Sequence, residues 1–385
     1  MTRPRRRGES LLLAAAVVSA LGLAELVLRV WFTGPSLVKD PAHELILHPN
    51  PAYMPGVSGP SRLQASSLGL RAEQLTDAHA YRVLALGGST TECAGLDTGE
   101  AWPAILEVGL STELGRAVWV GNAGLSGVNS RHHLMQIGPL LEQVREVDAI
   151  LMLIGVNDML HGLRYEDADT DWYANGQERV RRHYEAFGVP ARPRFGPLWE
   201  RTELVHLLRR ARQGWAYMRV ATETRIGDDG RAYVAARQAR AASPKVDELP
   251  DLRDARAVYR HNVERIIAIA EEHGTDVVLV THPVLWSADL PPELEALVYL
   301  GETREALAGG ERSYYSTGAL ARGMSEFNAE TLDICADHAL SCFDLAAILP
   351  SDTTVFYDDV HFNEQGARRV ASALAPFVAG VLRGR

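Results

Sequence analysis

A strand-like apolar stretch, YRVLALGGSTTECAG from Tyr81 to Gly95, leads into two glycines and a serine. Gly87 and Gly88 permit a tight turn, and a turn of this kind exposes the side chain of Ser89. A hydroxyl presented in that way is suited to nucleophilic attack on a carbonyl carbon. The letters GGST also fit a helix cap or a phosphate-binding loop, although the lysine and spacing of a Walker motif are missing.

A possible base for that hydroxyl stands near the C-terminus, in the segment YDDVHFNEQG. Asp358 and His361 are three residues apart, so a single turn can bring the carboxylate to one imidazole nitrogen. The other nitrogen is then free to take the proton of a serine. Taken singly, the same two residues would fit a helix cap and a surface histidine.

Two further segments could stabilise negative charge, GNAGLSGVNS and GVND. The side-chain amide of Asn157 and the backbone N–H groups of Ser89 and Gly127 can converge on the oxyanion of a tetrahedral intermediate. Each residue alone is as typical of a loop or turn. Their joint occurrence, each after an apolar run, predicts an acyl-transfer site.

Five short apolar runs must position these residues: RVLALG, AVWVGNAG, DAILMLIG, DVVLVTH and SCFDL. Continuous apolar runs of this length are typical of strands that are covered on both faces. Helical stretches lie between them. The clearest places one apolar face before the fourth run and ends at Gly274; its members are Tyr259, Val263, Ile266, Ile267 and Ala270. The alternation predicts an α/β fold whose ligands bind beyond the carboxyl ends of parallel strands.

In these blocks the sequence resembles the SGNH hydrolases, also called GDSL esterases or lipases. The resemblance covers roughly residues 81 to 381 and rests on GGST, NAGLSG, GVND and DDVHFN, with further similarity in EAWPAIL. It implies a three-layer α/β/α sandwich of flavodoxin-like type with a five-stranded parallel sheet. It also implies Ser89 as nucleophile, His361 as base and Asp358 as its orienting carboxylate. The implied oxyanion donors are the N–H groups of Ser89 and Gly127 and the side chain of Asn157.

One residue departs from the family pattern. Gly88 stands where the GDS form has an aspartate. No catalytic group is lost by this change, but the short motif becomes less diagnostic.

The connection after GVND is about ninety residues long, far above the usual length, so it should have a structure or function of its own. Residues 163 to 240 carry fifteen arginines against eleven acidic residues. Three tryptophans are interleaved with them, Trp172, Trp199 and Trp215, together with the tyrosines Tyr173, Tyr184 and Tyr217. A helical insertion over residues 163–250 could form a lid that contacts an anionic or sugar-like substrate. A solvated insertion with ordinary core aromatics is the alternative.

The N-terminus reads as a membrane anchor. Arg3, Arg5, Arg6 and Arg7 precede an apolar run from Ser10 to Phe32. As a helix this run would extend about 34 Å, enough to cross a bilayer. The basic cluster favours a cytoplasmic N-terminus and an extracytoplasmic body, periplasmic or extracellular. A signal peptide cleaved near Ala24 is the alternative.

The expected domain organisation follows from these segments. Residues 1–9 form a basic tail, 10–32 a transmembrane helix, 33–80 an extended membrane-proximal segment rich in Pro, Gly and Ser, and 81–385 the SGNH domain.

Composition excludes several other classes. A net charge of -10 and a pI near 5.7 argue against a nucleic-acid partner. Cys93, Cys335 and Cys342 form neither a CxxC pair nor a histidine-containing metal motif, so no metal or cofactor is expected. Cys335 and Cys342 would pair as a disulfide in an exported domain, or remain two buried thiols.

The resulting expectation is a serine esterase that hydrolyses acyl or acetyl esters, of acylated carbohydrate or another small ester, through an acyl-enzyme. The alternatives are an O-acyltransferase of an envelope polysaccharide and a non-catalytic binding domain on the same fold.

Overall fold

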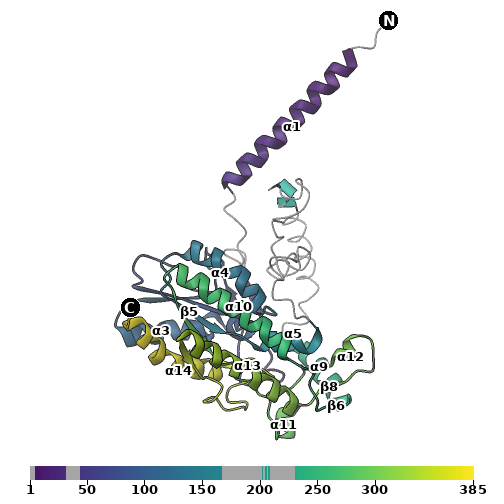
Figure 1. Ribbon diagram of the computed structural model, residues 1–385, viewed down its shortest axis with the longest axis vertical. Coiled ribbons are helices and arrows are strands. Elements are labelled where there is room, and N and C mark those ends of the chain that lie inside the picture. The colour runs from purple at the N-terminus through teal and green to yellow at the C-terminus, as the bar shows by residue number, and fades with distance from the viewer. Residues whose placement is uncertain (1–4, 32–43, 167–201, 203, 206, 209–229) are drawn as a thin grey trace. The chain divides into compact units, whose positions relative to one another are not determined.

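Five parallel strands form the central sheet, in the order β4-β3-β5-β7-β9. Figure 1 labels the middle strand, β5. They are β3 (Tyr81–Gly87), β4 (Val118–Asn122), β5 (Ala149–Leu153), β7 (Asp276–Val280) and β9 (Ser341–Phe343). Each coincides with one of the five apolar runs. Every residue of β4 and β5 is buried, because helices cover both faces of the sheet. The predicted five-stranded parallel sheet is therefore confirmed.

The structure, a computed structural model, describes residues 5–31, 44–166, 202, 204, 205, 207, 208 and 230–385. The chain divides into two compact units. The first comprises Met1–Ser36 and Tyr173–Glu223, and the second, which contains the sheet, comprises Leu37–Trp172 and Thr224–Arg385.

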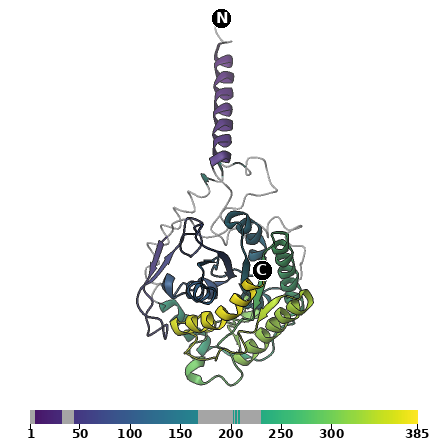
Figure 2. The ribbon, with the colours of Figure 1, turned by 90° about the vertical axis from the view of Figure 1, so that its left-hand side faces the viewer.

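Helices form the outer two layers. On one side α3 (Trp102–Leu114) packs against α14 (Glu364–Arg383), which Figure 2 shows in yellow. Their backbones approach closely at Gly109, where an added β-carbon would lie 3.1 Å from that of Ala375. The other layer contains four helices: α4 (Ser130–Val144), α5 (Val156–Arg164), α10 (Arg253–Glu272) and α13 (Thr317–His338). The three-layer sandwich is thus also confirmed.

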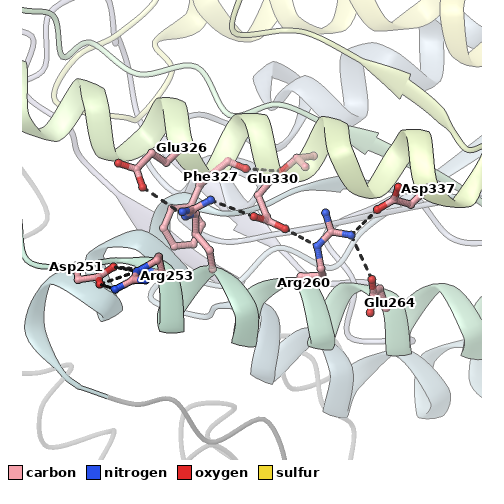
Figure 3. Close-up of polar contacts among 10 residues, drawn as sticks. Asp251, Arg253, Arg260, Glu264, Glu326, Phe327, Glu330 and Asp337 are labelled. Atoms are coloured by element: carbon pink, nitrogen blue, oxygen red, sulfur yellow. Dashed lines mark hydrogen bonds and ion pairs between the residues drawn. The ribbon is translucent and has the colours of Figure 1, made fainter.

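Helix α10 carries the buried face predicted for it, with Tyr259, Val263 and Ile266 inaccessible to solvent. On its outer side, arginines pair with carboxylates of α13 (Figure 3). Arg256 lies 3.3 Å from both Glu326 and Glu330, and Arg260 pairs with Glu330 and Asp337. Such partly exposed pairs stabilise only modestly one by one, but as a network they hold the two helices in register.

Residues 44–80 fold onto the α/β domain, although the sequence suggested only an extended segment. Strands β1 (Glu44–Leu47) and β2 (Ser61–Gln64) form an antiparallel pair. Apolar side chains of the segment enter the core: Met54, Val57 and Leu70. The backbone N–H of Arg71 donates to the carbonyl of Asn122 at 3.0 Å, at the end of β4.

The connection between α5 and α10 includes, at its C-terminal end, the helix α9 (Arg231–Ala242) and the strand β6 (Lys245–Val246). Strand β6 pairs with β8 (Tyr314–Tyr315) in a segment that also contains α11 (Pro292–Glu295) and α12 (Arg304–Leu307). The guanidinium of Arg237 on α9 donates to the carbonyls of Tyr53, Leu297 and Tyr357 at 2.7 to 3.1 Å. The C-terminal end of the predicted insertion is therefore bonded to the domain. The six aromatic residues on which the lid hypothesis depends lie outside the described residues.

The N-terminal helix α1 (Arg5–Trp31) contains a stretch, Ser10–Leu28, that is long and apolar enough to cross a membrane. Most of its leucines are exposed, including Leu12 and Leu13. Within the same compact unit, the carboxylate of Glu25 accepts a hydrogen bond from the backbone N–H of Leu204 at 3.2 Å. These properties fit an anchor and also fit a signal sequence.

Cys335 and Cys342 form a disulfide, with their α-carbons 6.2 Å apart. The bond links the last turn of α13 to the edge strand β9. Of the two states that the sequence left open for these cysteines, the disulfide is the one found. Cys93 is a buried free thiol.

Candidate active site

The nucleophile turn depends on two glycines. Strand β3 ends at Gly87, and Ser89 begins the four-residue helix α2 (Ser89–Glu92). A β-carbon on Gly87 would lie 2.1 Å from Oγ1 of Thr91 and 2.7 Å from the carbonyl oxygen of Leu153, so a larger residue cannot fit. The turn leaves Ser89 partly exposed at the carboxyl end of the sheet, which is where ligands bind in this class of fold.

Ser89, His361 and Asp358 form a continuous hydrogen-bonded line. Oγ of Ser89 lies 2.7 Å from Nε2 of His361. Nδ1 of the same ring lies 2.8 Å and 2.9 Å from the two carboxylate oxygens of Asp358. Because Nδ1 donates its hydrogen to the carboxylate, Nε2 is the nitrogen that accepts the serine hydrogen.

Burial and backbone contacts organise Asp358. Its side chain is fully buried, and Oδ1 accepts hydrogen bonds from the backbone N–H groups of Val360 at 3.0 Å and His361 at 2.9 Å. Burial lowers the pKa of His361, but the charge of Asp358 and its hydrogen bond raise it by more, so the pKa lies above its ordinary value. The ring of Tyr357 stacks on His361 at a centroid distance of 5.5 Å and limits its rotation.

Besides Ser89 itself, the predicted oxyanion donors are Asn157, in the first turn of α5, and Gly127, on the loop after β4. A β-carbon on Gly88 would lie 2.5 Å from Nδ2 of Asn157, so the amide is directly beside the turn. Nδ2 also donates to the carbonyl of Val128 at 2.6 Å. Gly127 is exposed with a φ of +77°, a conformation that favours glycine. Its loop is attached to the turn by the Leu125 N–H, which donates to the Gly87 carbonyl at 3.2 Å.

Asp158 secures the segment that presents Asn157. Its buried carboxylate accepts hydrogen bonds from the backbone N–H and hydroxyl of Ser130, at the start of α4. Burial raises the pKa of Asp158 to about 6, and the bonds from Ser130 counteract part of this effect. Asp158, which follows Asn157 in the GVND segment, therefore joins α5 to α4.

A second histidine, not singled out in the sequence, lies beneath the nucleophile turn. Nδ1 of His282 donates to the carbonyl of Pro283 at 3.0 Å, so Nε2 accepts a hydrogen bond from the hydroxyl of Thr90, also at 3.0 Å. Burial, together with the nearby His361, lowers the pKa of His282 to about 4. The only sequence signal was its place as the last residue of the fourth apolar run, DVVLVTH.

The adjacent carboxylate, Asp359, is buried and bonded to the segment after β7. It accepts hydrogen bonds from Nε1 of Trp286 and the N–H of Tyr299, each at 2.8 Å. Burial and the neighbouring Asp358 raise its pKa to about 6. Asp359 therefore holds the segment after β7.

In the part of the chain that the structure describes, no three His, Cys, Asp or Glu side chains come together as a metal-binding group. The arrangement at Ser89 can carry out acyl transfer with protein groups alone.

Comparison with families of known proteins gives a match over most of the α/β domain. Residues 85–369 match the GDSL-like lipase/acylhydrolase family. No curated protein matches the sequence.

Several solved structures are similar to this chain at low identity. A carbohydrate acetylesterase family member from Sinorhizobium meliloti is 14% identical, with 79% of this chain and 99% of that chain covered and a TM-score of 0.41. A putative arylesterase from Agrobacterium tumefaciens is 15% identical, covering 78% and 99%, with a TM-score of 0.41. The acetylxylan esterase Axe2 from Geobacillus stearothermophilus is 12% identical, covering 80% and 96%, with a TM-score of 0.38.

The family match spans well over half of the chain and includes Ser89, Gly127, Asn157, Asp358 and His361. The chain belongs to the GDSL-like lipase/acylhydrolase family and is an SGNH serine hydrolase.

Proposed function

We propose that the protein hydrolyses acyl esters with Ser89 as nucleophile, His361 as general base and acid, and Asp358 as the group that orients the histidine. The observation that carries this proposal is the line of hydrogen bonds from Asp358 through His361 to Ser89. The base is already within hydrogen-bond reach of the proton that it must remove.

The reaction has two steps. In the first, His361 takes the Ser89 proton as Oγ attacks the ester carbonyl, and the same proton then goes to the leaving alcohol as the acyl-enzyme forms. In the second, water gives a proton to His361 and attacks the acyl-enzyme. The carboxylic acid is released and Oγ recovers its proton.

The negative charge of each tetrahedral intermediate needs donors at the carboxyl end of the sheet. The backbone N–H groups of Ser89 and Gly127 and Nδ2 of Asn157 serve this purpose in the proposal. Nδ2 carries two hydrogens, and one points to Val128, so the other is available for the oxyanion. Loss of one such donor typically costs about 3 kcal/mol of transition-state stabilisation, roughly a hundredfold or more in turnover.

We also propose that the catalytic domain lies outside the cytoplasm, held by α1. Four arginines precede the apolar helix, and basic residues favour the cytoplasmic side. The Cys335–Cys342 disulfide supports the same location, since disulfides persist mainly in oxidising compartments.

The substrate class within this proposal is an acylated carbohydrate or another small ester. Its support is the arginine-rich, aromatic composition of residues 163 to 240, which suits sugar faces and anionic groups. Transfer of the acyl group to a sugar hydroxyl would use the same acyl-enzyme, and product analysis separates the two outcomes.

The test uses the full-length protein in detergent. p-Nitrophenyl acetate and longer-chain esters are supplied with and without a sugar acceptor, and free acid and acylated sugar are both measured. We expect the wild type to release free acid. The Ser89→Ala variant, compared at the same amount of folded protein, should release none. Acylated sugar as the main product would establish transfer, and activity retained in Ser89→Ala would place the nucleophile elsewhere.

A further inference from the structure

The helix that carries Ser89 is too short to satisfy its own carbonyl groups. Helix α2 has four residues, and the last four carbonyls of any helix lack a partner within that helix. In this protein, side chains from three other segments supply the missing donors. Nε1 of Trp102 donates to the carbonyl of Thr90 at 3.0 Å, and Nδ2 of Asn122 donates to that of Thr91 at 2.7 Å.

Arg71 donates to the last carbonyl of the helix, that of Glu92, and to two carbonyls of the loop that follows. Its Nη1 donates to the carbonyl of Glu92 and, at 2.8 Å, to that of Cys93, while Nη2 donates to the carbonyl of Leu96. Nε lies 3.4 Å from Oγ1 of Thr98. One guanidinium therefore spans the end of α2 and the loop that follows it.

Burial makes this arrangement costly unless it is well satisfied. Arg71 is only 3% exposed, and burial lowers its pKa. Carbonyl acceptors offset the loss of water around its N–H groups. The backbone that Arg71 binds has a left-handed conformation at Cys93, with a φ of +52°, which non-glycine residues rarely adopt.

The same contacts connect α2 to the oxyanion loop. The carboxylate of Glu92 accepts a hydrogen bond from the hydroxyl of Ser126, next to Gly127. Asn122, whose side chain binds the Thr91 carbonyl, also accepts from the Gly124 N–H at 2.9 Å and receives the backbone N–H of Arg71. A displacement of Arg71 would therefore shift both Ser89 and the loop that carries Gly127.

We propose that Arg71 is a positioning residue of the active site, which fixes Ser89 relative to His361 and Asn157 by holding the carbonyls at the end of α2. The inference rests on the proposed function. Arg71 precedes the residues matched by the family, 85–369, and lies in the segment that joins α1 to the domain. The nucleophile turn is therefore held in place by the membrane-proximal part of the chain.

Substitution by lysine tests the fork geometry. Lysine keeps the positive charge but is a point donor on a flexible stem, and it cannot span the carbonyls of Glu92, Cys93 and Leu96. The matched control is Arg62→Lys in β2, an arginine of the same segment whose side chain is 58% exposed and pairs with Glu44.

The experiment measures, in full-length protein in detergent, the second-order rate of labelling by a fluorophosphonate probe, kcat and KM for p-nitrophenyl acetate, and Tm. All rates are taken well below Tm. We expect Arg71→Lys to label and turn over about tenfold more slowly or worse with little change in KM, since small misplacement of reacting atoms is expensive. Arg62→Lys should match the wild type. Guanidinium chloride at millimolar concentration should partly restore the labelling rate of Arg71→Ala.

A lowered Tm with a normal labelling rate in Arg71→Lys would show a purely structural role and overturn the inference. If both Arg71 variants fail to fold, Trp102→Phe decides, because it removes the indole donor to the Thr90 carbonyl, which keeps the weaker bond from Sγ of Cys93 at 3.2 Å; an unchanged labelling rate there also overturns it. Failure of the wild type to label would instead refute the proposed function itself.

Discussion

Asn157 occupies the space that a side chain on residue 88 would need. An added β-carbon on Gly88 would lie 2.5 Å from Nδ2 of Asn157, closer than any such contact normally found. The GDS form of the motif has an aspartate at this position. In this protein the close approach of the Asn157 amide requires a glycine there. The absence of a side chain lets the amide approach the nucleophile turn.

Gly88→Ala should therefore reduce turnover by displacing Asn157 from the oxyanion position. We expect kcat to fall by roughly tenfold to a hundredfold, with KM for p-nitrophenyl acetate much less affected. Gly138→Ala in α4 is the control, because an added β-carbon there meets nothing within 4 Å. Equal activity of Gly88→Ala and the wild type would mean that the amide has room to move without loss.

Alanine at His361, or asparagine at Asp358, should lower kcat by about a thousandfold or more. The first change removes the base, and the second leaves the base without the carboxylate that orients it. His338→Asn is the control, since His338 is part-exposed and lies near Glu264, away from the serine. Circular dichroism checks folding, and near-normal kcat in folded His361→Ala would refute the assignment of the base.

The pH dependence of kcat/KM should show a single acidic limb governed by His361. Only the neutral ring can accept the Ser89 proton, so activity is lost as pH falls through the pKa of His361. Asp358 raises that pKa above the ordinary value of 6.5, and the midpoint of the limb should lie above 6.5 accordingly.

Asp358→Asn should move that midpoint to lower pH, because the stabilising negative charge is gone. The residual activity of the variant suffices for the measurement if enzyme concentration is raised. A midpoint that shifts upward, or not at all, would show that another group governs the limb.

Membrane orientation can be tested with reporters fused after Arg385. The arginines before the apolar stretch Ser10–Leu28 of α1 predict that an alkaline phosphatase fusion is active and a cytoplasmic fluorescent reporter is not. Replacing Arg3, Arg5, Arg6 and Arg7 with glutamate should weaken this preference. Activity of the cytoplasmic reporter in the unaltered chain would reverse the proposed topology.

Local sequence was sufficient for the elements that build the sheet. A strand covered on both faces needs an unbroken apolar run, and this requirement is visible within five to seven residues, as in β3 and β5. The same holds for Asp358 and His361, whose three-residue spacing lets one turn join them. Ser89 could be placed because two glycines after a strand restrict the backbone to a tight turn.

Only the tertiary structure decided which distant groups meet that turn. Arg71 reaches carbonyls more than twenty residues away, and His282 reaches Thr90 across 192 residues. Hydrogen bonds of this kind leave no periodic signal, because any donor that the fold brings near a carbonyl can make them.

For the same reason composition alone suggested an extended segment over residues 33–80, whereas burial of Met54, Val57 and Leu70 and the contacts of Arg71 join residues 44–80 to the catalytic domain. The pairing of Cys335 with Cys342 was likewise settled by the 6.2 Å between their α-carbons, a distance that the packing of α13 against β9 sets.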